Sequence, residues 1–256
     1  MGKKDGKGGV LGKKSPGLFI GTSGWNYKDW KDAFYAGVKQ KEWLEHYARN
    51  FNAVEVNATF YRLLQDKVVT GWAKRSPDNF SFAIKGSRYI THNKRLKDSA
   101  ESVKKQKDNM SALQHKIPAV VWQLPANFSK DLDRLRDFAE NLGHWPESRH
   151  ALEFRDTSWF DEETADLLGQ HSLANCISDA EKWPRWDSVC TDMVYVRLHG
   201  NTETYHSSYS EKELGGWAQK IRAWLDEARS VHVYFDNTDA RAAPGNALRL
   251  KELLRH

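Results

Sequence analysis

The chain has 256 residues, a formal net charge of +5 and two cysteines, Cys176 and Cys190. This length suits one large domain, and no apolar stretch is long enough to span a bilayer. Two cysteines without a Cys-x-x-Cys spacing indicate neither a disulfide framework nor a cysteine-ligated metal site. We therefore expect a cytoplasmic protein with reduced thiols and with Cys176 in the core. The mild positive charge permits a polyanionic partner without requiring one.

Residues 1–16 are rich in lysine and glycine and contain no apolar core. A secretory signal needs such a core, so we interpret this segment as a disordered basic tail. The rest of the chain, residues 17–256, shows repeated apolar runs without a linker between them. It is therefore predicted to form one domain.

Eight short apolar runs follow one another along the chain, and most of them end in polar residues. They predict strands at 18–20, 53–57, 80–85, 118–125, 151–155, 173–179, 193–200 and 231–237. Apolar residues with helical spacing predict helices at 42–51, 67–74, 99–114, 132–142, 162–170, 211–229 and 244–254. Asp161 is placed to cap the helix that starts at residue 162, and residues 59–62 are expected to form a loop.

Eight strands that alternate with helices predict an α/β fold, a single-domain TIM (β/α)8 barrel. A doubly wound open sheet is the competing fold. That fold usually has fewer strands, and its glycine-rich fingerprint between the first strand and a helix is missing here. The strand count therefore favours the barrel.

Several short motifs, taken together and in order, resemble those of the YecE-like family, also called domain of unknown function 72. They are Ile20–Trp25, Val54–Tyr61, Phe82–Lys85, Trp122–Pro125, Glu153–Arg155, Val196–Gly200 and Ala243–Leu248. The resemblance implies a TIM barrel, and it implies no activity because the family's biochemical role is not established. One departure lies near the last strand, where Asp236 stands at a position for which the resemblance implies Asn.

Active sites of TIM barrels lie at the carboxyl ends of the strands. The candidate catalytic residues are therefore Glu55, Lys85, Glu153, Asp179 and His199. The candidate ligand-binding residues are Asn57, Gln123, Arg155, Arg197, Tyr209, Asp236 and Asn237. A purely structural interpretation pairs Glu55 with Lys85, Glu153 with Arg155 and Asp179 with Arg197, as ion pairs that plug the barrel. Ion pairs stabilise less than apolar packing, so this interpretation is the weaker one.

The first functional interpretation is a site for a phosphorylated, nucleic-acid-like or otherwise anionic ligand. Lys85, Arg155 and Arg197 would hold the anion, since arginine forms forked bonds to phosphate and lysine supplies a point charge. A carboxylate would act as acid or base and His199 would transfer a proton. Alternatively, Lys85 would form a Schiff base. This interpretation predicts a metal-independent hydrolase or lyase without a cofactor.

The second interpretation is a divalent metal site, as in an enzyme similar to endonuclease IV or a sugar isomerase. Suitable ligand types are present at Glu55, Glu153, Asp179, His199 and Asp236. Three cations at the same rim would repel a metal ion, and His199 is the one clear histidine at a strand end. These two observations disfavour metal dependence.

The third interpretation is a non-catalytic protein that binds nucleic acid. Aromatic residues of the rim, such as Tyr61, Tyr89 and Tyr209, would stack on bases, and the basic segment 92–97 would attract phosphates. The expected partner is therefore an anionic small molecule or a nucleic acid, with no membrane contact. A monomer is the simplest oligomeric state.

Overall fold

The computed structural model describes residues 17–239 and 241–255, so the tail expected at residues 1–16 lies outside the described residues. Eight parallel strands form a nearly closed ring in the order β1-β8-β7-β6-β5-β4-β3-β2. They are β1 (Leu18–Thr22), β2 (Ala53–Val56), β3 (Ser81–Lys85), β4 (Ala119–Gln123), β5 (Arg149–Glu153), β6 (Ala174–Ala180), β7 (Met193–Gly200) and β8 (Ser230–Phe235). The predicted TIM barrel and all eight predicted strands are confirmed.

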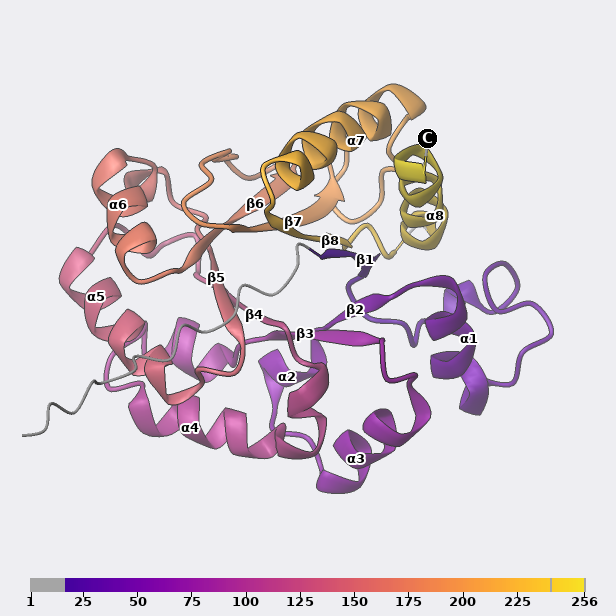
Figure 1. The fold of residues 1–256 in the computed structure, drawn as a ribbon, viewed down its shortest axis with the longest axis horizontal. Coiled ribbons are helices and arrows are strands. Elements are labelled where there is room, and N and C mark those ends of the chain that lie inside the picture. Colours follow the sequence, from indigo (N-terminus) through magenta and orange to yellow (C-terminus); the bar gives the residue numbers. More distant parts are fainter. Residues whose placement is uncertain (1–16, 240, 256) are drawn as a thin grey trace, which may run out of the picture.

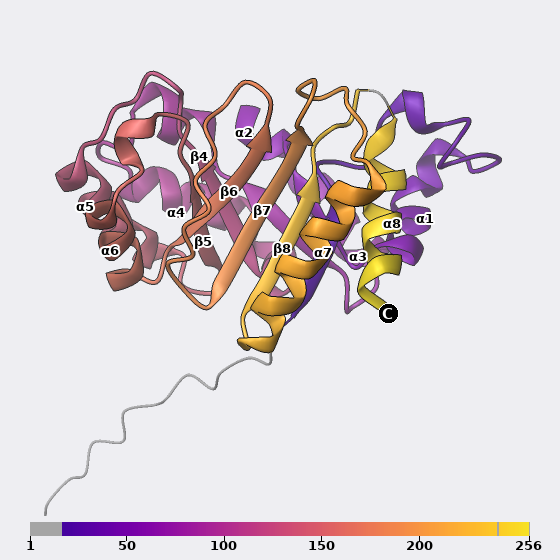
Figure 2. The same cartoon turned by 90° about the horizontal axis from the view of Figure 1, so that it is seen from above.

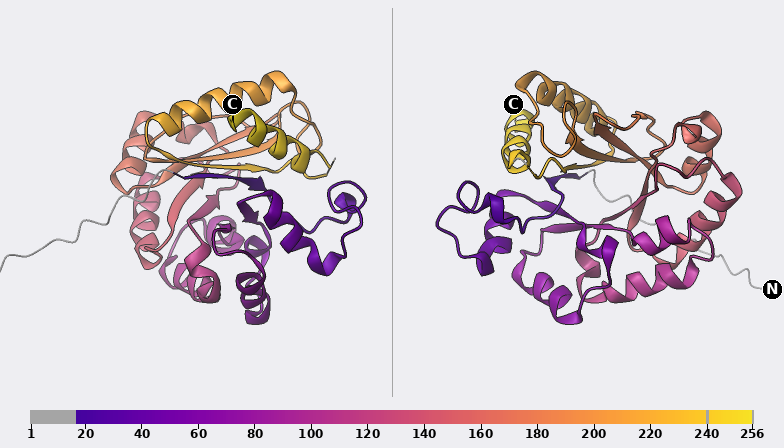
Figure 3. Two further views of the ribbon diagram at one scale, coloured as in Figure 1. Left: turned by 45° about the vertical axis from the view of Figure 1, so that its right-hand side comes forward. Right: turned by 180° about the vertical axis from the view of Figure 1, so that it is seen from behind.

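Helices surround this ring on its outer side (Figure 1). They are α1 (Trp43–Asn50), α3 (Asp66–Arg75), α4 (Ala100–Asn109), α5 (Leu132–Asn141), α6 (Glu162–Gln170), α7 (Glu211–Asp226) and α8 (Ala242–Arg255), and an eighth, short helix, α2 (Ala58–Tyr61), lies at the carboxyl edge of the strands. Two further views show the same separation of strands inside and helices outside (Figure 3). No helix of the described ranges is long and apolar enough to cross a membrane.

Seven of these helices match the predicted ones, and two details differ. The loop expected at residues 59–62 is largely the short helix α2, because Asn57 already has right-handed helical angles and its carbonyl accepts the N–H of Phe60 at 3.1 Å. The helix expected to reach residue 114 ends at Asn109, where 3-10 turns replace it. Asp161 caps α6 as predicted, accepting the N–H of Thr164 at 2.9 Å.

All strands point the same way, so their carboxyl ends meet at one edge of the barrel (Figure 2). Inside the ring, successive side chains alternate between the barrel interior and the helices. The amino-terminal half of the interior is apolar and contains Ala53, Ala83, Val121, Ala151, Cys176, Tyr195 and Tyr234. Cys176 is buried there as expected. The charged residues discussed below occupy the interior positions that follow, nearer the carboxyl ends.

The seam between β1 and β2 closes the barrel mainly through side chains. The Asn52 amide accepts the N–H of Ile20 at 3.1 Å and donates to the carbonyl of Leu18 at 2.6 Å. Further along, the Tyr47 hydroxyl accepts the N–H of Thr22 at 2.8 Å and donates to the carbonyl of Ala53 at 3.3 Å. Between described residues, the backbone contributes one bridge between Ser23 and Glu55. Side chains from α1 and its end therefore replace much of a strand–strand ladder.

Candidate functional site

Arg197 of β7 stands at the centre of the barrel mouth and is fully buried. Its guanidinium donates to Glu55 Oε1 at 2.7 Å, to Glu153 Oε2 at 2.7 Å and to Asp236 Oδ2 at 2.9 Å. Burial disfavours its charge, but the surrounding carboxylates outweigh burial and raise the pKa of Arg197 well above its ordinary value. One strand-end cation therefore neutralises carboxylates from three other strand ends.

Glu55 and Glu153, both fully buried, are held by further donors. The hydroxyls of Ser23 and Tyr195 donate to Glu55 at 2.7 Å and 2.8 Å. Arg155 donates to Glu153 Oε1 at 2.8 Å, which confirms the predicted pairing of these two residues. Burial would raise the pKa of Glu153, but Arg155 and Arg197 outweigh it and hold that pKa well below its ordinary value. Glu153 is therefore ionised near neutral pH.

His199, two residues after Arg197, lies on the same face of β7. Its Nδ1 is 2.9 Å from Asp236 Oδ2, out of line for a hydrogen bond. Burial and the Arg197 charge lower the pKa of His199, so the ring is neutral at pH 7. Burial favours the neutral acid of Asp236, but the charge of Arg197 outweighs it and holds the pKa of Asp236 at about 2. Asp236 is thus part of the central network.

Lys85, the last residue of β3, differs from every other charge in the network. Its side chain is buried, yet within the described residues its ammonium makes no hydrogen bond and no ion pair. The ammonium lies 4.5 Å from the centre of the Phe60 ring. Burial, followed by the charge of Arg197, lowers the pKa of Lys85 to about 8. Lys85 is therefore an amine that changes its charge near physiological pH.

Arg155 and His92 stand beside Lys85 at the entrance. The Arg155 guanidinium lies 3.5 Å from the centre of the Trp183 ring, and its side chain is slightly exposed. His92, in the turn Tyr89–Asn93, accepts or donates a 2.9 Å hydrogen bond with Thr91. Burial and the charges of Arg88, Lys85 and Arg155 lower the pKa of His92 to about 4. The entrance is therefore positive, while the carboxylates lie deeper.

Two of the three expected ion pairs are wrong. Glu55 pairs with Arg197 instead of Lys85. Asp179 pairs with Arg185 at 3.1 Å instead of Arg197. The side chains of Cys176 and Ser178 face the interior, so Asp179 belongs to the opposite face of β6, next to a register shift. Ser178, not Asp179, contacts the network through Glu153 at 3.4 Å.

Four of the candidate ligand-binding residues lie outside the charged network. Tyr209 and Asn237 tie loops together: the Tyr209 hydroxyl accepts the N–H of Gly200 at 3.1 Å, and the Asn237 amide donates to Asn246 at 2.9 Å. Gln123 is buried at the end of β4 without a described side-chain hydrogen bond. Asn57 lines a neighbouring cavity. Its backbone angles are helical, so the alternation of side chains along β2 ends at Val56 and Asn57 does not follow Glu55 into the barrel interior.

Sequence reasoning missed several residues of the site. Tyr195 follows the same alternation as Arg197 and His199, so this signal was present in the sequence. Ser178 could have been found in the same way. Trp183 and Arg185 lie in the irregular segment between β6 and β7, where no periodicity indicates which side chains turn inward.

The three carboxylates of the network all contact Arg197. Within the described ranges, no group of three or more His, Cys, Asp or Glu side chains is placed to hold a metal ion. The carboxylates of Glu55, Glu153 and Asp236 converge on the Arg197 guanidinium, which occupies the position that a cation would take.

The comparison with known proteins agrees with the fold and with the sequence motifs. The family model "Protein of unknown function DUF72" matches residues 19–256. The chain belongs to the DUF72 family. Its relatives in this family include YecE of Escherichia coli K12, which is 32% identical over 264 residues covering 93% of each chain. YunF of Bacillus subtilis is 24% identical over 272 residues, covering 93% of this chain and 94% of YunF.

A solved DUF72 structure supports the same conclusion. The crystal structure of a DUF72 family protein from Thermotoga maritima is 27% identical, covers 94% of this chain and 100% of its own, and superposes with a TM-score of 0.82. The DUF72 fold is therefore a single TIM barrel. None of these descriptions assigns an activity, so the chemistry of this DUF72 member has to be argued from its own residues.

Proposed function

We propose that the barrel mouth is a metal-independent active site for an anionic substrate, such as one that carries a phosphate group, and that Lys85 transfers a proton in the reaction. The observation that carries this proposal is the burial of Lys85 without an anionic partner. A buried charge without a partner is costly, so such groups are often kept for function.

A second buried lysine shows what a structural role requires. Lys116 is 3% exposed, and its ammonium donates to the carbonyls of Ala73 and Ser76 at 3.0 Å and 2.8 Å and to the Ser76 hydroxyl at 3.0 Å. All the hydrogens of its ammonium therefore have acceptors. Lys85 is buried to a similar degree, at 8% exposed, without any of these contacts. A substrate anion would supply the missing partner.

Arg155 is the second anion-binding group in this proposal. Its Nε and one terminal nitrogen contact Glu153, which leaves donors of the guanidinium directed elsewhere. Arg197, which the sequence also suggested as an anion holder, has its donors committed to three carboxylates. We therefore assign Arg197 to holding the carboxylates in place, and Lys85 and Arg155 to the substrate.

The proposed chemistry is general acid–base catalysis by Lys85. An amine with a pKa of about 8 exchanges protons readily near neutral pH. Hydrolysis and elimination both need a proton transfer of this kind, so the enzyme class is a hydrolase or a lyase. A Schiff base at Lys85 would use the same neutral amine and stays an alternative prediction.

Titration calorimetry with pyrophosphate tests the proposal. We expect pyrophosphate to bind to the wild type in the presence of EDTA, and its affinity to fall as the pH rises through about 8, where Lys85 loses its charge. Lys85→Met and Arg155→Met should each weaken binding at least about tenfold, since each removes a charged hydrogen bond.

Lys130→Met is the matched control, because Lys130 already contacts Asp161 and Glu163 at the start of α6. It should bind pyrophosphate like the wild type. The proposed anion site is wrong if the wild type and all three variants bind pyrophosphate with equal affinity. It is also wrong if binding to the wild type disappears with EDTA.

A further inference from the structure

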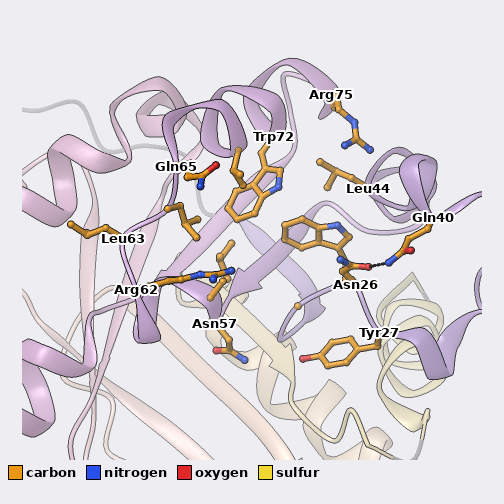
Figure 4. Close-up of a pocket in the computed structure, with 16 residues that line it drawn as sticks. Asn26, Tyr27, Gln40, Leu44, Asn57, Arg62, Leu63, Gln65, Trp72 and Arg75 are labelled. Atoms are coloured by element: carbon orange, nitrogen blue, oxygen red, sulfur yellow. Dashed lines mark hydrogen bonds between the residues drawn. The ribbon is translucent and has the colours of Figure 1, made fainter.

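A cavity of about 710 Å³ lies beside the barrel mouth, outside the network of Arg197. The loops after β1 and β2, together with α1 and α3, enclose it (Figure 4). This size is typical of pockets for small molecules. Its walls combine two half-buried tryptophans, Trp25 and Trp72, with the aliphatic side chains of Leu44, Val56, Leu64 and Val68.

Two polar side chains of the cavity have no partner among the residues that the structure describes. Asn57 Oδ1 is buried and accepts no hydrogen bond. Arg62 lines the cavity and makes neither a hydrogen bond nor an ion pair within the described ranges. Figure 4 shows Arg62 extending into the space between Trp72 and Asn57. Arg75, in contrast, is paired with Glu45 at 2.6 Å. Arg62 is thus a cation left for a ligand, while Asn57 Oδ1 has almost no surface open to the cavity.

The walls fit a flat ring. Trp25 and Trp72 meet edge to face, with ring centres 5.0 Å apart, and both remain partly exposed towards the cavity. A tryptophan face stacks well on a heteroaromatic ring. The cavity is also lined by the polar side chains of Asn26, Gln40 and Gln65, which can contact the polar edge of such a ring. The Asn57 amide nitrogen, a donor, suits an acceptor on the edge of a nucleobase.

This cavity adjoins the proposed anion site through α2. Ala58 at the start of α2 lines the cavity, while Phe60 in the same helix contacts the Lys85 ammonium. On the other side, the hydroxyl of Tyr27 in the cavity wall donates to the carbonyl of Ser23 at 2.6 Å. The hydroxyl of Ser23 in turn donates to Glu55. The cavity and the Lys85 ammonium are therefore both contacted by residues of α2.

We infer that the substrate is a nucleotide, with its base in the cavity between Trp25, Trp72 and Asn57 and its phosphate at Lys85 and Arg155. This inference rests on the proposed function for the phosphate end and adds the recognition of the base. Arg62 contributes a positive charge beside the ring, where it contacts a carbonyl or a second phosphate of the nucleotide.

Calorimetric titrations with the four ribonucleoside 5′-monophosphates, with adenosine and with ribose 5-phosphate test this inference on the full chain. At least one monophosphate should bind more tightly than ribose 5-phosphate. Trp72→Leu and Asn57→Ala should weaken that monophosphate, the tryptophan change by roughly 5- to 150-fold, which is the range that base stacking contributes. Neither change should affect ribose 5-phosphate. Asn57→Ala keeps the test valid if Trp72→Leu does not fold.

Trp224→Leu is the control, because Trp224 is also half-buried but lies on α7, away from the cavity. It should bind like the wild type. If every monophosphate binds no better than ribose 5-phosphate, or if Trp72→Leu and Asn57→Ala leave the affinity unchanged, the base site is wrong while the anion site stands. If Trp72→Leu weakens adenosine but Lys85→Met leaves the monophosphate unaffected, the anion site is wrong instead.

Discussion

Burial of the Lys85 side chain has a cost that depends on pH. Its pKa of about 8 in the folded protein lies below the ordinary value of 10.5. Between these values the unfolded chain binds a proton that the folded chain has lost, so the contribution of Lys85 to stability rises with pH. Below about pH 8 the charged Lys85 ammonium lowers the free energy of unfolding by its full amount. This effect disappears as the pH approaches 10.5.

Replacing Lys85 by Met should therefore stabilise the protein at pH 7. The expected gain in the free energy of unfolding is about 3 kcal/mol, the equivalent of the pKa difference, and it should vanish near pH 10.5. Urea unfolding of both proteins at pH 7 and pH 10 measures this gain. A variant that is less stable than the wild type at pH 7 would show that Lys85 has a structural partner. A gain in stability together with a loss of pyrophosphate binding is typical of a functional residue.

At the scale of single elements, helix α3 depends on a side chain that is distant in sequence. The α-helix ends at Arg75, and its last carbonyls are unpaired within the helix. The Lys116 ammonium donates hydrogen bonds to two carbonyl groups in this region, those of Ala73 and Ser76. A cation at a helix carboxyl end also interacts favourably with the helix dipole. Lys116 is thus the C-terminal cap of α3.

We expect Lys116→Met to lower the free energy of unfolding by about 2 to 4 kcal/mol, because buried carbonyls lose a charged donor. Urea denaturation at pH 7 measures the change. Lys107→Met is the comparison, since the exposed pair of Lys107 with Glu147 should contribute less than about 1 kcal/mol. Equal effects of the two substitutions would contradict the capping role.

At the scale of the whole molecule, the barrel closes at a seam that side chains hold together. Asn52 and Tyr47 supply donors and acceptors to β1, where a neighbouring strand would otherwise do so. Gly21 permits this close approach, because a Cβ at that position would lie 1.9 Å from the Ala53 carbonyl oxygen. The geometry of the mouth, with Glu55 on β2 and Ser23 after β1, depends on this seam.

Tyr47→Phe should open the seam locally. Removing the hydroxyl leaves the buried N–H of Thr22 without its acceptor, at an expected cost of about 1 to 3 kcal/mol in the free energy of unfolding. Hydrogen exchange should become faster at Thr22 and Ile20 by more than it does in β5, which lies across the barrel and serves as the internal reference. Uniform acceleration along all strands would show that the seam has no separate stability.

The sequence by itself determined the elements and the charged residues at the barrel mouth. Apolar runs of strand length, separated by segments with helical spacing, predict eight strands and their helices because burial on both faces of a parallel sheet requires such runs. Charged residues that close these runs, such as Glu55, Lys85 and Glu153, predict a polar barrel mouth. These inferences depend on local patterns only, and the structure confirms them.

Tertiary structure alone decided which charges meet. Arg197 and Glu55 are 142 residues apart, and their contact depends on how far each strand extends around the ring. The register shift at Asp179 and the helical turn at Asn57 change which side chains point inward, so alternation fails at these two positions. The carboxylates that contact Arg197 could therefore not be predicted from the sequence. The lack of an ion-pair partner for Lys85 could not be predicted either, because it depends on every residue that the fold brings near Lys85.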